Sequence, residues 1–469
     1  MRRTKIVATI GPASQNLETL TRMAAAGMDV ARLNFSHGDR EMHAENADLV
    51  RRAASAAGRQ VAILQDLPGP KIRIGRLEDG TVELKPGEKL VLLCGADSLV
   101  GNGERMAVSW AGMASAVDPE DIIYLADGAI RLRVQTVREG DGEVETAVEI
   151  GGSVSTRQGL NIPGSTRGLP AVPEEDLDML RFGESIGVDL VALSFVRTAE
   201  DVTSVRRHTR SPLIAKIEKP QAVDAAEEII RAADCVMVAR GDLGIELPIE
   251  DVPIVQKQLL RTAGKLARPA ITATQMLDSM VNSSRPTRAE VADVANAILD
   301  GTDAVMLSQE TAIGSYPVGA VEMMAAVAER TEHTLPYRTW NEERVRRDAR
   351  DPAYTIAYSA CAAARDLHLA ALVVPTLSGR SARLISAHRP QVPIYALSPG
   401  KETVRRCALM WGVQAGSMRR HEVTEALIAD AARRVVELGW VKSGARVGIT
   451  AGLPSGRPGT TSLFQIQRV

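Results

Sequence analysis

The sequence of 469 residues has few cysteines, few aromatic residues and little net charge. Its four cysteines lie far apart and form no Cys-x-x-Cys pair, which argues against a zinc site or a disulfide framework and fits a reducing cytoplasm. Aromatic residues make up only 3%, so few side chains could stack on the bases of a single-stranded nucleic acid. A net charge of −2 gives no electrostatic field that would attract nucleic acid or an anionic membrane.

Long apolar runs and the common nucleotide-binding loops are also missing. No apolar run approaches the ~20 residues of a membrane helix, and the apolar stretch after the basic N-terminus is too short for a signal peptide. The chain has neither a Gly-x-x-x-x-Gly-Lys-Ser/Thr loop nor a Gly-x-Gly-x-x-Gly loop followed by an acid that could bind ribose. A P-loop enzyme and a Rossmann dehydrogenase are therefore disfavoured. We expect a cytoplasmic protein without nucleic-acid or membrane partners.

The chain does contain a regular alternation of short apolar strands and amphipathic helical segments. Eight such units predict an α/β fold built on a (β/α)₈ TIM barrel, formed by residues 1–70 and 168–340. The active site of such a barrel lies at the carboxyl ends of its strands. The predicted strands are Lys5–Ile10, Val30–Phe35, Val61–Gln65, Leu190–Phe195, Leu213–Ile217, Val236–Ala239, Ala270–Thr274 and Ala304–Leu307.

Residues 71–167 interrupt this alternation and have a different pattern. Turn pairs such as Asp-Gly and Pro-Gly recur, and the alternating segments Ile130–Val137 and Glu143–Ile150 flank Glu-Gly-Asp-Gly, which is a hairpin signal. We therefore predict an inserted all-β domain, a small β-barrel, after the third strand of the large barrel. At that position the insert could close over the active site as a lid. The alternative is that it decorates the barrel passively.

A polar, Arg- and Glu-rich connector, 336–351, precedes a second region of alternating strands and helices. We predict a C-terminal α/β domain over residues 352–469, with a mostly parallel sheet. Its last strand, Ser462–Gln467, is expected to pair antiparallel at the edge. The other predicted strands are Ala371–Thr376, Pro393–Leu397, Val413–Ala415 and Arg446–Thr450.

Charged side chains follow two neighbouring strands of the predicted barrel. Lys216 and Glu218 are two residues apart and therefore point to the same side of their strand. Asp242 closes the next strand, after a helical segment at Gln221–Ala233. A lysine beside two carboxylates suits a divalent metal and an anionic substrate. Taken alone, the same residues would fit a salt bridge at a strand end equally well.

Six longer segments, taken together and in this order, resemble the signature sequences of the pyruvate kinase family. The resemblance covers nearly the whole chain, including the insert and the C-terminal domain. It implies transfer of a phosphoryl group from phosphoenolpyruvate to ADP, which gives pyruvate and ATP. The segments are Ala31–Gly38, Ala215–Pro220, Ala239–Gly244, Ala273–Leu277, Arg285–Glu290 and Met306–Thr311.

The resemblance also implies a role for individual residues. Glu218 and Asp242 would hold the catalytic Mg²⁺ or Mn²⁺, for which carboxylate oxygens are suitable ligands, and Lys216 would lie over the transferring phosphoryl group. The remaining implied contacts are Arg32 with the phosphoryl group, the backbone N–H groups of Gly241 and Asp242 with the substrate carboxylate, Thr274 with a proton relayed through water, and Asn34, His37 and Arg73 with the nucleotide phosphates.

One departure from the family pattern can be interpreted. Potassium-dependent members carry a threonine after an aspartate and a glutamate shortly afterwards. Here Asp66 remains, but Leu67 replaces the threonine and Lys71 replaces the glutamate. The ammonium of Lys71 would then supply the positive charge of the cation beside the former ligands Asn34, Ser36 and Asp66. We expect an enzyme that does not require K⁺; an exposed lysine at the hinge of the insert is the alternative.

The C-terminal domain contains a loop suited to phosphate. Hydroxyls, a glycine, backbone N–H groups and an arginine follow a strand and open a helix. In the family the matching loop binds the phosphate of an allosteric effector, and a second loop, 450–461, with Arg457, would close on it. A sugar bisphosphate, a sugar monophosphate and AMP all remain possible, and the family is usually a homotetramer. The residues of the first loop are Thr376, Ser378, Gly379, Arg380 and Ser381.

Two other functions remain open at this point. Another Mg²⁺-dependent barrel enzyme that acts on pyruvate or phosphoenolpyruvate, an aldolase or a lyase, would share the acids but would not need the insert or the third domain. A non-catalytic ligand sensor could have lost Lys216. A coupled assay for pyruvate with and without ADP separates these possibilities.

Overall fold

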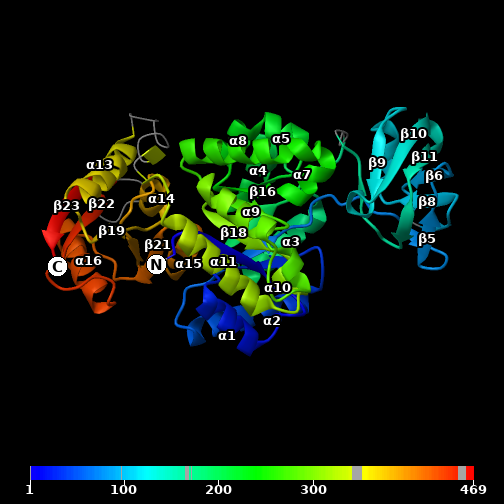
Figure 1. Ribbon diagram of the computed structural model, residues 1–469. Coiled ribbons are helices and arrows are strands. Elements are labelled where there is room, and N and C mark those ends of the chain that lie inside the picture. The colour runs from blue at the N-terminus through cyan, green and yellow to red at the C-terminus, as the bar shows by residue number, and fades with distance from the viewer. Residues whose placement is uncertain are drawn as a thin grey trace.

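The computed structural model describes residues 2–96, 98–163, 168–170, 172–337, 339–340, 351–452 and 461–469, with the backbone alone for residue 127. Figure 1 shows three bodies in a row, with the barrel in the middle. The insert lies at the right of that view and the C-terminal domain at the left. Among the described residues, no helix is long and apolar enough to cross a membrane.

The eight predicted strands form a closed parallel barrel, which confirms the predicted fold class. Neighbouring strands pair in the order β1-β18-β17-β16-β15-β14-β3-β2. Six of the eight strands differ from their predicted ranges by one or two residues at an end, and two agree with them at both ends. The strands are β1 (Lys5–Thr9), β2 (Val30–Asn34), β3 (Ala62–Asp66), β14 (Leu190–Leu193), β15 (Leu213–Ile217), β16 (Cys235–Ala239), β17 (Ala270–Ala273) and β18 (Ala304–Leu307).

Helices follow the strands and cover the outside of the barrel. Asn16 and Asp39 cap the first two helices by accepting the backbone N–H of Thr19 and Met42. The single helix predicted at Gln221–Ala233 is divided at Ala225 into two shorter helices. The helices are α1 (Leu17–Ala26), α2 (Arg40–Ala56), α3 (Glu174–Ser185), α4 (Ala199–Arg206), α5 (Pro220–Asp224), α6 (Ala226–Ala232), α7 (Arg240–Glu246), α8 (Val252–Lys265), α9 (Arg288–Leu299), α10 (Gln309–Ala312) and α11 (Pro317–Glu332).

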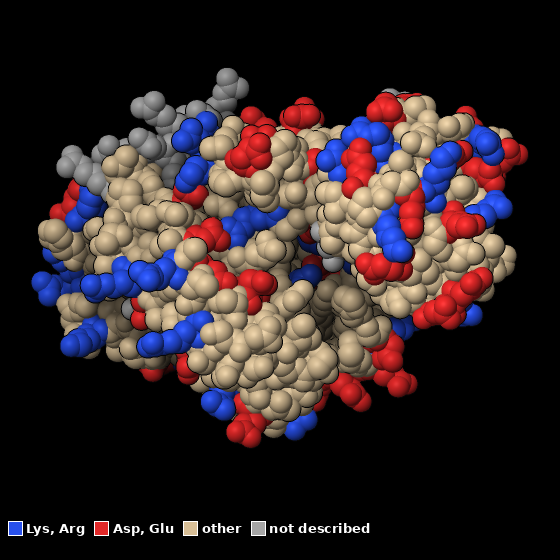
Figure 2. All heavy atoms as spheres, turned by 45° about the vertical axis from the view of Figure 1, so that its right-hand side comes forward, with Lys and Arg blue, Asp and Glu red and all other residues tan. Residues whose placement is uncertain are grey.

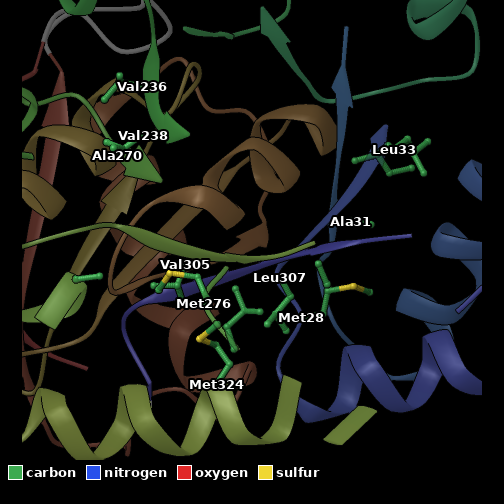
Figure 3. Close-up of a cluster of buried hydrophobic side chains, with 14 of the residues drawn as sticks. Met28, Ala31, Leu33, Val236, Val238, Ala270, Met276, Val305, Leu307 and Met324 are labelled. Carbon is green, nitrogen blue, oxygen red and sulfur yellow. The ribbon is translucent and has the colours of Figure 1, made fainter. Parts of the chain in front are cut away.

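Successive residues of each barrel strand fill two different cores. Val7 belongs to the cluster inside the barrel, whereas Ile6 and its next-but-one neighbour Ala8 pack outward against the helices. Figure 3 shows part of the outer layer, where Leu307 and Met324 lie between the barrel strands and the helix below them. A rigid, fully buried framework therefore carries the side chains at the strand ends.

The insert follows β3 and is built almost entirely from strands. Its long hairpin, β10 with β11, is antiparallel as predicted, and Gly142 supplies the left-handed conformation at the turn with a φ of 65°. Hydrogen bonding among the described strands gives an open six-stranded sheet, β13-β9-β10-β11-β6-β8, beside two-stranded pairs. The strands are β4 (Arg76–Leu77), β5 (Thr81–Leu84), β6 (Lys89–Cys94), β7 (Val100–Gly101), β8 (Arg105–Val108), β9 (Ile122–Leu125), β10 (Ile130–Arg138), β11 (Glu143–Ile150), β12 (Gly152–Ser155) and β13 (Leu160–Asn161).

The C-terminal domain is a five-stranded sheet with helices packed against it. Its order is β21-β20-β19-β22-β23, and the last strand pairs antiparallel at the edge, as predicted. Most of the predicted connector, residues 338 and 341–350, lies outside the described residues. The elements are α13 (Pro352–Asp366), β19 (Ala371–Pro375), α14 (Arg380–Ala387), β20 (Ile394–Ser398), α15 (Lys401–Arg406), β21 (Val413–Ser417), α16 (Thr424–Glu437), β22 (Arg446–Gly452) and β23 (Thr461–Arg468).

The contact between the C-terminal domain and the barrel includes two arginines that pair with aspartates at the starts of barrel strands. Arg405 Nε donates to Asp189 Oδ1 at 2.6 Å, and Arg389 Nη1 donates to Asp303 Oδ1 at 2.8 Å. Leu409 joins the core inside the barrel. Because Asp189 and Asp303 precede β14 and β18, this contact occupies the amino ends of the strands. The opposite end stays free for the site described next.

Candidate active site

Lys216 lies in a network of charges at the carboxyl ends of β15, β3 and β2, across the end of the intervening strand β14. Its Nζ lies 2.7 Å from Glu218 Oε1 and 3.4 Å from Asp66 Oδ1. Asp66 Oδ2 accepts hydrogen bonds from Arg32, with Nη2 at 2.6 Å and Nε at 2.7 Å. Arg32 Nη1 also donates to Thr9 Oγ1 at 3.0 Å. The structure therefore brings two predicted phosphoryl-contacting cations together on one buried carboxylate.

The charges in this network fix its protonation states. Burial works against the charge of Lys216, but the carboxylates of Asp66, Glu218 and Asp242 outweigh it and raise the lysine pKa. For Asp66, the positive charges of Lys216 and Arg32 outweigh burial and lower the pKa. Both side chains are therefore ionised at neutral pH. The cluster therefore holds two permanently charged cations in a site that is largely shielded from water, where their electrostatic effect is strong.

Glu218 and Asp242, the two residues predicted to bind the metal, lie close enough for their charges to interact. Glu218 Oε2 accepts the backbone N–H of Phe195 at 2.8 Å. Burial, and then the negative charge of Glu218, raises the pKa of Asp242 to about 6. Two buried carboxylates that repel each other suit a divalent cation. Among the described residues no group of three or more His, Cys, Asp or Glu side chains is arranged to hold a metal ion, so a metal here would take its other ligands from substrate or water.

The residue after β17 is held in a strained conformation. Thr274 has a φ of 70°, in a region that residues with a Cβ seldom adopt. Its Oγ1 accepts the N–H of Gly241 at 2.7 Å and donates to the carbonyl of Ala273 at 2.6 Å. Arg240 Nη2 donates to the Thr274 carbonyl at 2.7 Å, and Arg240 Nη1 pairs with Asp293 Oδ2 at 2.7 Å. Arg240 thus holds the backbone of Thr274 in this conformation through a hydrogen bond.

Lys71 reaches back from the insert to the barrel rim. Its Nζ donates to Ser36 Oγ at 2.7 Å. The residue is exposed at the rim, but partial desolvation, and then the positive charges of Lys216 and Arg73, lowers the lysine pKa. The hydrophobic side chain of Leu67 is 1% exposed, belongs to the core layer between the strands and the helices, and offers no polar ligand. Nearby, Asn34 Oδ1 accepts the backbone N–H of Ser36 at 3.2 Å.

A cleft of about 390 Å³ lies between the insert and the barrel. Figure 2 shows the surface hollowed there, between the insert at the right and the barrel. His37 and Asp242 line it from the barrel, whereas Arg73 and Arg157 line it from the insert. Arg73 Nη1 donates to the carbonyl of Arg157 at 3.0 Å. Burial, and then the positive charge of Lys71, lowers the pKa of His37, so this ring is neutral at pH 7.

The predicted phosphate loop of the C-terminal domain connects β19 to α14. Gly379 has a φ of 82°, and its N–H donates to Thr376 Oγ1 at 2.9 Å. Arg380 pairs with Asp351, and the hydroxyls of Ser381 and Thr461 lie 2.5 Å apart. Residues 453–460 of the second predicted loop, including Arg457, lie outside the described residues.

The sequence patterns missed several residues that complete the site. Ser194 Oγ accepts a hydrogen bond from Lys216 Nζ at 2.7 Å, and Thr9 contacts Arg32 as described above. Both are polar residues at or just after the end of an apolar barrel strand, so the rule that identified Lys216 would have identified them. Asp176 lies on a helix, and no signal in the sequence connects it to the site.

A closed parallel barrel with cations, carboxylates and a cleft at the carboxyl ends of its strands defines a TIM-barrel enzyme that acts on an anionic substrate. Two family models match the chain: "Pyruvate kinase, barrel domain" over residues 1–321 and "Pyruvate kinase, alpha/beta domain" over residues 354–467. The chain therefore belongs to the pyruvate kinase family.

Individual relatives agree with the family models over the full chain. The chain is 44% identical to a pyruvate kinase of Geobacillus stearothermophilus over 471 residues, which cover 99% of this chain and 80% of that protein. It is 42% identical to a pyruvate kinase of Bacillus licheniformis over 472 residues, with the same two coverages. A crystal structure of a pyruvate kinase from Cryptosporidium parvum superposes with a TM-score of 0.92 at 34% identity, covering 100% of this chain and 96% of that one.

Proposed function

We propose that this enzyme transfers the phosphoryl group of phosphoenolpyruvate to ADP at the mouth of the barrel, with Lys216, Arg32 and Thr274 as its catalytic residues. The proposal rests on one observation: the side chains of Lys216 and Arg32 come together with buried carboxylates at the carboxyl ends of the barrel strands. These carboxylates are Asp66, Glu218 and Asp242. Phosphoryl transfer needs positioning and charge stabilisation more than covalent catalysis. This network provides both, because each cation is fixed by a carboxylate before substrate binds.

The residues of the chain divide the work. Lys216 and Arg32 bind the phosphoryl oxygens and stabilise the charge on them, while Asp66 orients both cations. Mg²⁺, which the family generally uses, would be held by Glu218 and Asp242 and would neutralise charge on the substrate oxygens. Backbone N–H groups of Gly241 and Asp242, at the start of α7, would bind the substrate carboxylate, for which the Gly241 N–H would have to leave Thr274 Oγ1. Thr274 orients the water that delivers a proton to the enolate carbon.

A coupled assay tests the proposed activity directly. Pyruvate should form from phosphoenolpyruvate only when both ADP and a divalent cation are present, and ATP should form in equal amount. Formation of pyruvate without ADP would instead indicate a lyase or a phosphatase and would refute the proposal. The cleft lined by His37 and Arg73 is where we place the ADP phosphates. Asn34, which the resemblance also assigns to them, does not line this cleft.

We expect divalent-cation binding to weaken below pH 6. The pKa of Asp242 is raised to about 6 in the metal-free enzyme, so a metal must displace a proton below that pH and none above it. The apparent affinity for Mn²⁺ should fall up to about tenfold per pH unit below pH 6 and stay constant between pH 7 and 8. Mn²⁺ titrations followed by electron paramagnetic resonance, without substrate, measure this. A constant affinity down to pH 5 would remove Asp242 from the metal site.

We also propose that the enzyme does not require K⁺. The ammonium of Lys71 contacts Ser36, and both Asp66 and Asp242 act on its pKa, so a fixed positive charge lies among the residues inferred to be former cation ligands. Activity in buffers free of K⁺ and Na⁺ tests the proposal, and strict dependence on added K⁺ would refute it.

A phosphorylated metabolite is the proposed allosteric effector of the C-terminal domain. The loop Thr376–Ser381 opens α14, whose N-terminus favours an anion. A cleft of about 620 Å³ between this helix and the barrel helices α6 and α8 supports the proposal, because it contains an excess of positive charge. Burial, and then the charge of Arg268, lowers the pKa of Arg383 to about 10. The basic residues that line the cleft are Arg231, Lys265, Arg268, Arg380 and Arg383.

Replacing Arg380 by alanine should weaken the response to the effector without changing the basal rate. The half-saturating concentration of whichever sugar phosphate or AMP affects the wild type should rise about ten- to hundredfold, as expected for the loss of a charge-assisted hydrogen bond of about 1.5–3 kcal/mol. The control is Arg365→Ala, an exposed arginine of the same domain that pairs with Asp366. If no member of the panel changes wild-type activity, the proposed effector site is wrong.

We propose that the enzyme is a homotetramer, as the family resemblance implies, and that it is cytoplasmic, as its cysteine content implies. All four cysteines are free in the structure. Light scattering on the purified protein tests the tetramer, and a monomeric mass would refute it.

A further inference from the structure

The insert is joined to the barrel by a short hinge, Leu67–Lys71, whose backbone is held by the barrel. The Leu67 N–H donates to the carbonyl of Ala192 at 3.0 Å, which continues the pairing of β3 with β14. The Leu67 carbonyl accepts the hydroxyl of Ser194 at 2.7 Å. Because the same hydroxyl accepts a hydrogen bond from Lys216 Nζ, a chain of two hydrogen bonds connects the reactive lysine to the hinge.

Gly69, in the middle of the hinge, is held by Asp176. Its N–H donates to Asp176 Oδ2 at 2.8 Å. Gly69 has a φ of 69°, and a Cβ there would lie 2.7 Å from Phe195 Cδ2, so the backbone passes too close to the barrel rim for any other residue. The carbonyl of Gly69 in turn accepts the N–H of Lys71 at 2.8 Å. One carboxylate therefore fixes the turn from which the Lys71 side chain departs.

Asp176 is an unusual residue at this place, because its burial is unfavourable for its charge. It lies in the first turn of α3 and is 3% exposed. Burial raises its pKa to about 6 and outweighs the hydrogen bond from Gly69, which lowers it. The charged groups that also act on it are Glu175 on its own helix, Lys71 in the hinge and Asp66 at the end of β3. The Asp176 carboxyl therefore binds a proton more tightly in the native state than in the unfolded chain. The stability contributed by the group is present at low pH and is lost as the pH rises from 3.8 towards about 6.

We propose that Asp176 is a positioning residue for the reaction: by holding the Gly69 N–H it fixes the hinge, and with the hinge it fixes Lys71 and the base of the insert that carries Arg73. A carboxylate that costs stability at neutral pH fits a functional constraint better than a structural one. Its effect should reach the nucleotide side of the cleft, because Arg73 and Arg157 belong to the insert. The residues proposed to bind phosphoenolpyruvate lie on or just after β2, β15 and β17, outside the insert. Loss of the Asp176 contact should therefore affect the binding of phosphoenolpyruvate less than that of the nucleotide.

The test compares Asp176→Ala, which removes the acceptor, with Asp176→Asn, which keeps an oxygen but no charge. Asp178→Ala is the matched control, because Asp178 lies on the same helix but is exposed and pairs only with Arg181 at 2.5 Å among the contacts described. For Asp176→Ala we expect the KM for ADP to rise about tenfold and the KM for phosphoenolpyruvate to change less than twofold, since a small misplacement costs one to two orders of magnitude. Asp176→Asn should recover most of the loss.

Two further measurements make the outcome decisive. The melting temperature of both Asp176 variants at pH 8 should equal or exceed that of the wild type, and amide exchange in segment 67–71 should be faster in Asp176→Ala only. An equal rise of both KM values together with a lower melting temperature would overturn the proposal in favour of a structural role. Unchanged KM values for Asp176→Ala would overturn it as well.

The inference rests on the proposed function in one respect, namely that the cleft binds ADP. The two can fail separately. If the wild-type enzyme forms pyruvate without ADP, the proposed binding of ADP in the cleft is refuted. The exchange rate of the Gly69 amide would still show whether Asp176 holds the hinge.

Discussion

Lys216→Met is expected to lower kcat by about 10²–10³-fold, which is the typical effect of removing one preorganised donor from a transition state. The side chain is largely buried and its positive charge is maintained by three carboxylates, so it is fixed in place before substrate arrives. Arg32 remains in the variant and continues to bind the phosphoryl group. The KM for phosphoenolpyruvate should therefore change far less than kcat.

The metal site gives this prediction an internal check. Without Lys216 the carboxylates of Glu218 and Asp242 carry more unbalanced negative charge, so the affinity for Mn²⁺ in the absence of substrate should be unchanged or higher. Weaker Mn²⁺ binding would mean that the site had collapsed, and the kinetic loss would then have another cause. Lys257→Met is the matched control, because Lys257 lies on α8 and pairs with Asp300 away from the barrel mouth. Near-normal turnover of Lys216→Met would exclude the lysine from the mechanism.

Lys71→Glu is expected to convert the enzyme into one that needs K⁺. The new carboxylate would lie beside Asp66 and Asp242, both of which act on the charge of Lys71 in the present structure. Three negative groups without a cation repel each other, so we expect activity without monovalent cation to fall by about 10²-fold, by analogy with the loss of one fixed stabilising charge. Saturating K⁺ should restore a large part of it.

Rates in tetramethylammonium buffer, with and without added KCl, measure this effect. Lys85→Glu serves as the control, because it makes the same change on an exposed part of the insert. The neutral variant Lys71→Met should lose activity as well but should respond to K⁺ less than the glutamate variant, since it lacks the new ligand. If Lys71→Glu retains full activity without K⁺, the charge of Lys71 does not take the place of a cation and the replacement hypothesis fails.

Local sequence information was sufficient for the strands and for most of the site. Lys216 and Glu218 share a face because a strand has a period of two, and Asp242 follows the next strand in the chain, so their convergence depended only on the barrel closing. Predicted strand boundaries differ from the observed ones where the residues beyond a strand end are of types that favour extended structure. The segment Leu190–Phe195 illustrates this, because Phe195 adopts a φ of 57° and ends the strand at Leu193.

The sequence by itself determined the alternation of strands and helices, the position of the insert, and which polar residues stand at the strand ends. These features follow from periodicity and from turn residues, which act over a few positions of the chain. Only the tertiary structure decided which side chain holds which: that Asp66 serves both Arg32 and Lys216, that Arg240 supports Thr274, and that Asp176 holds Gly69 across 107 positions of sequence. Such pairings arise from the closure of the barrel and from the path of the hinge across its rim, and no local pattern encodes them.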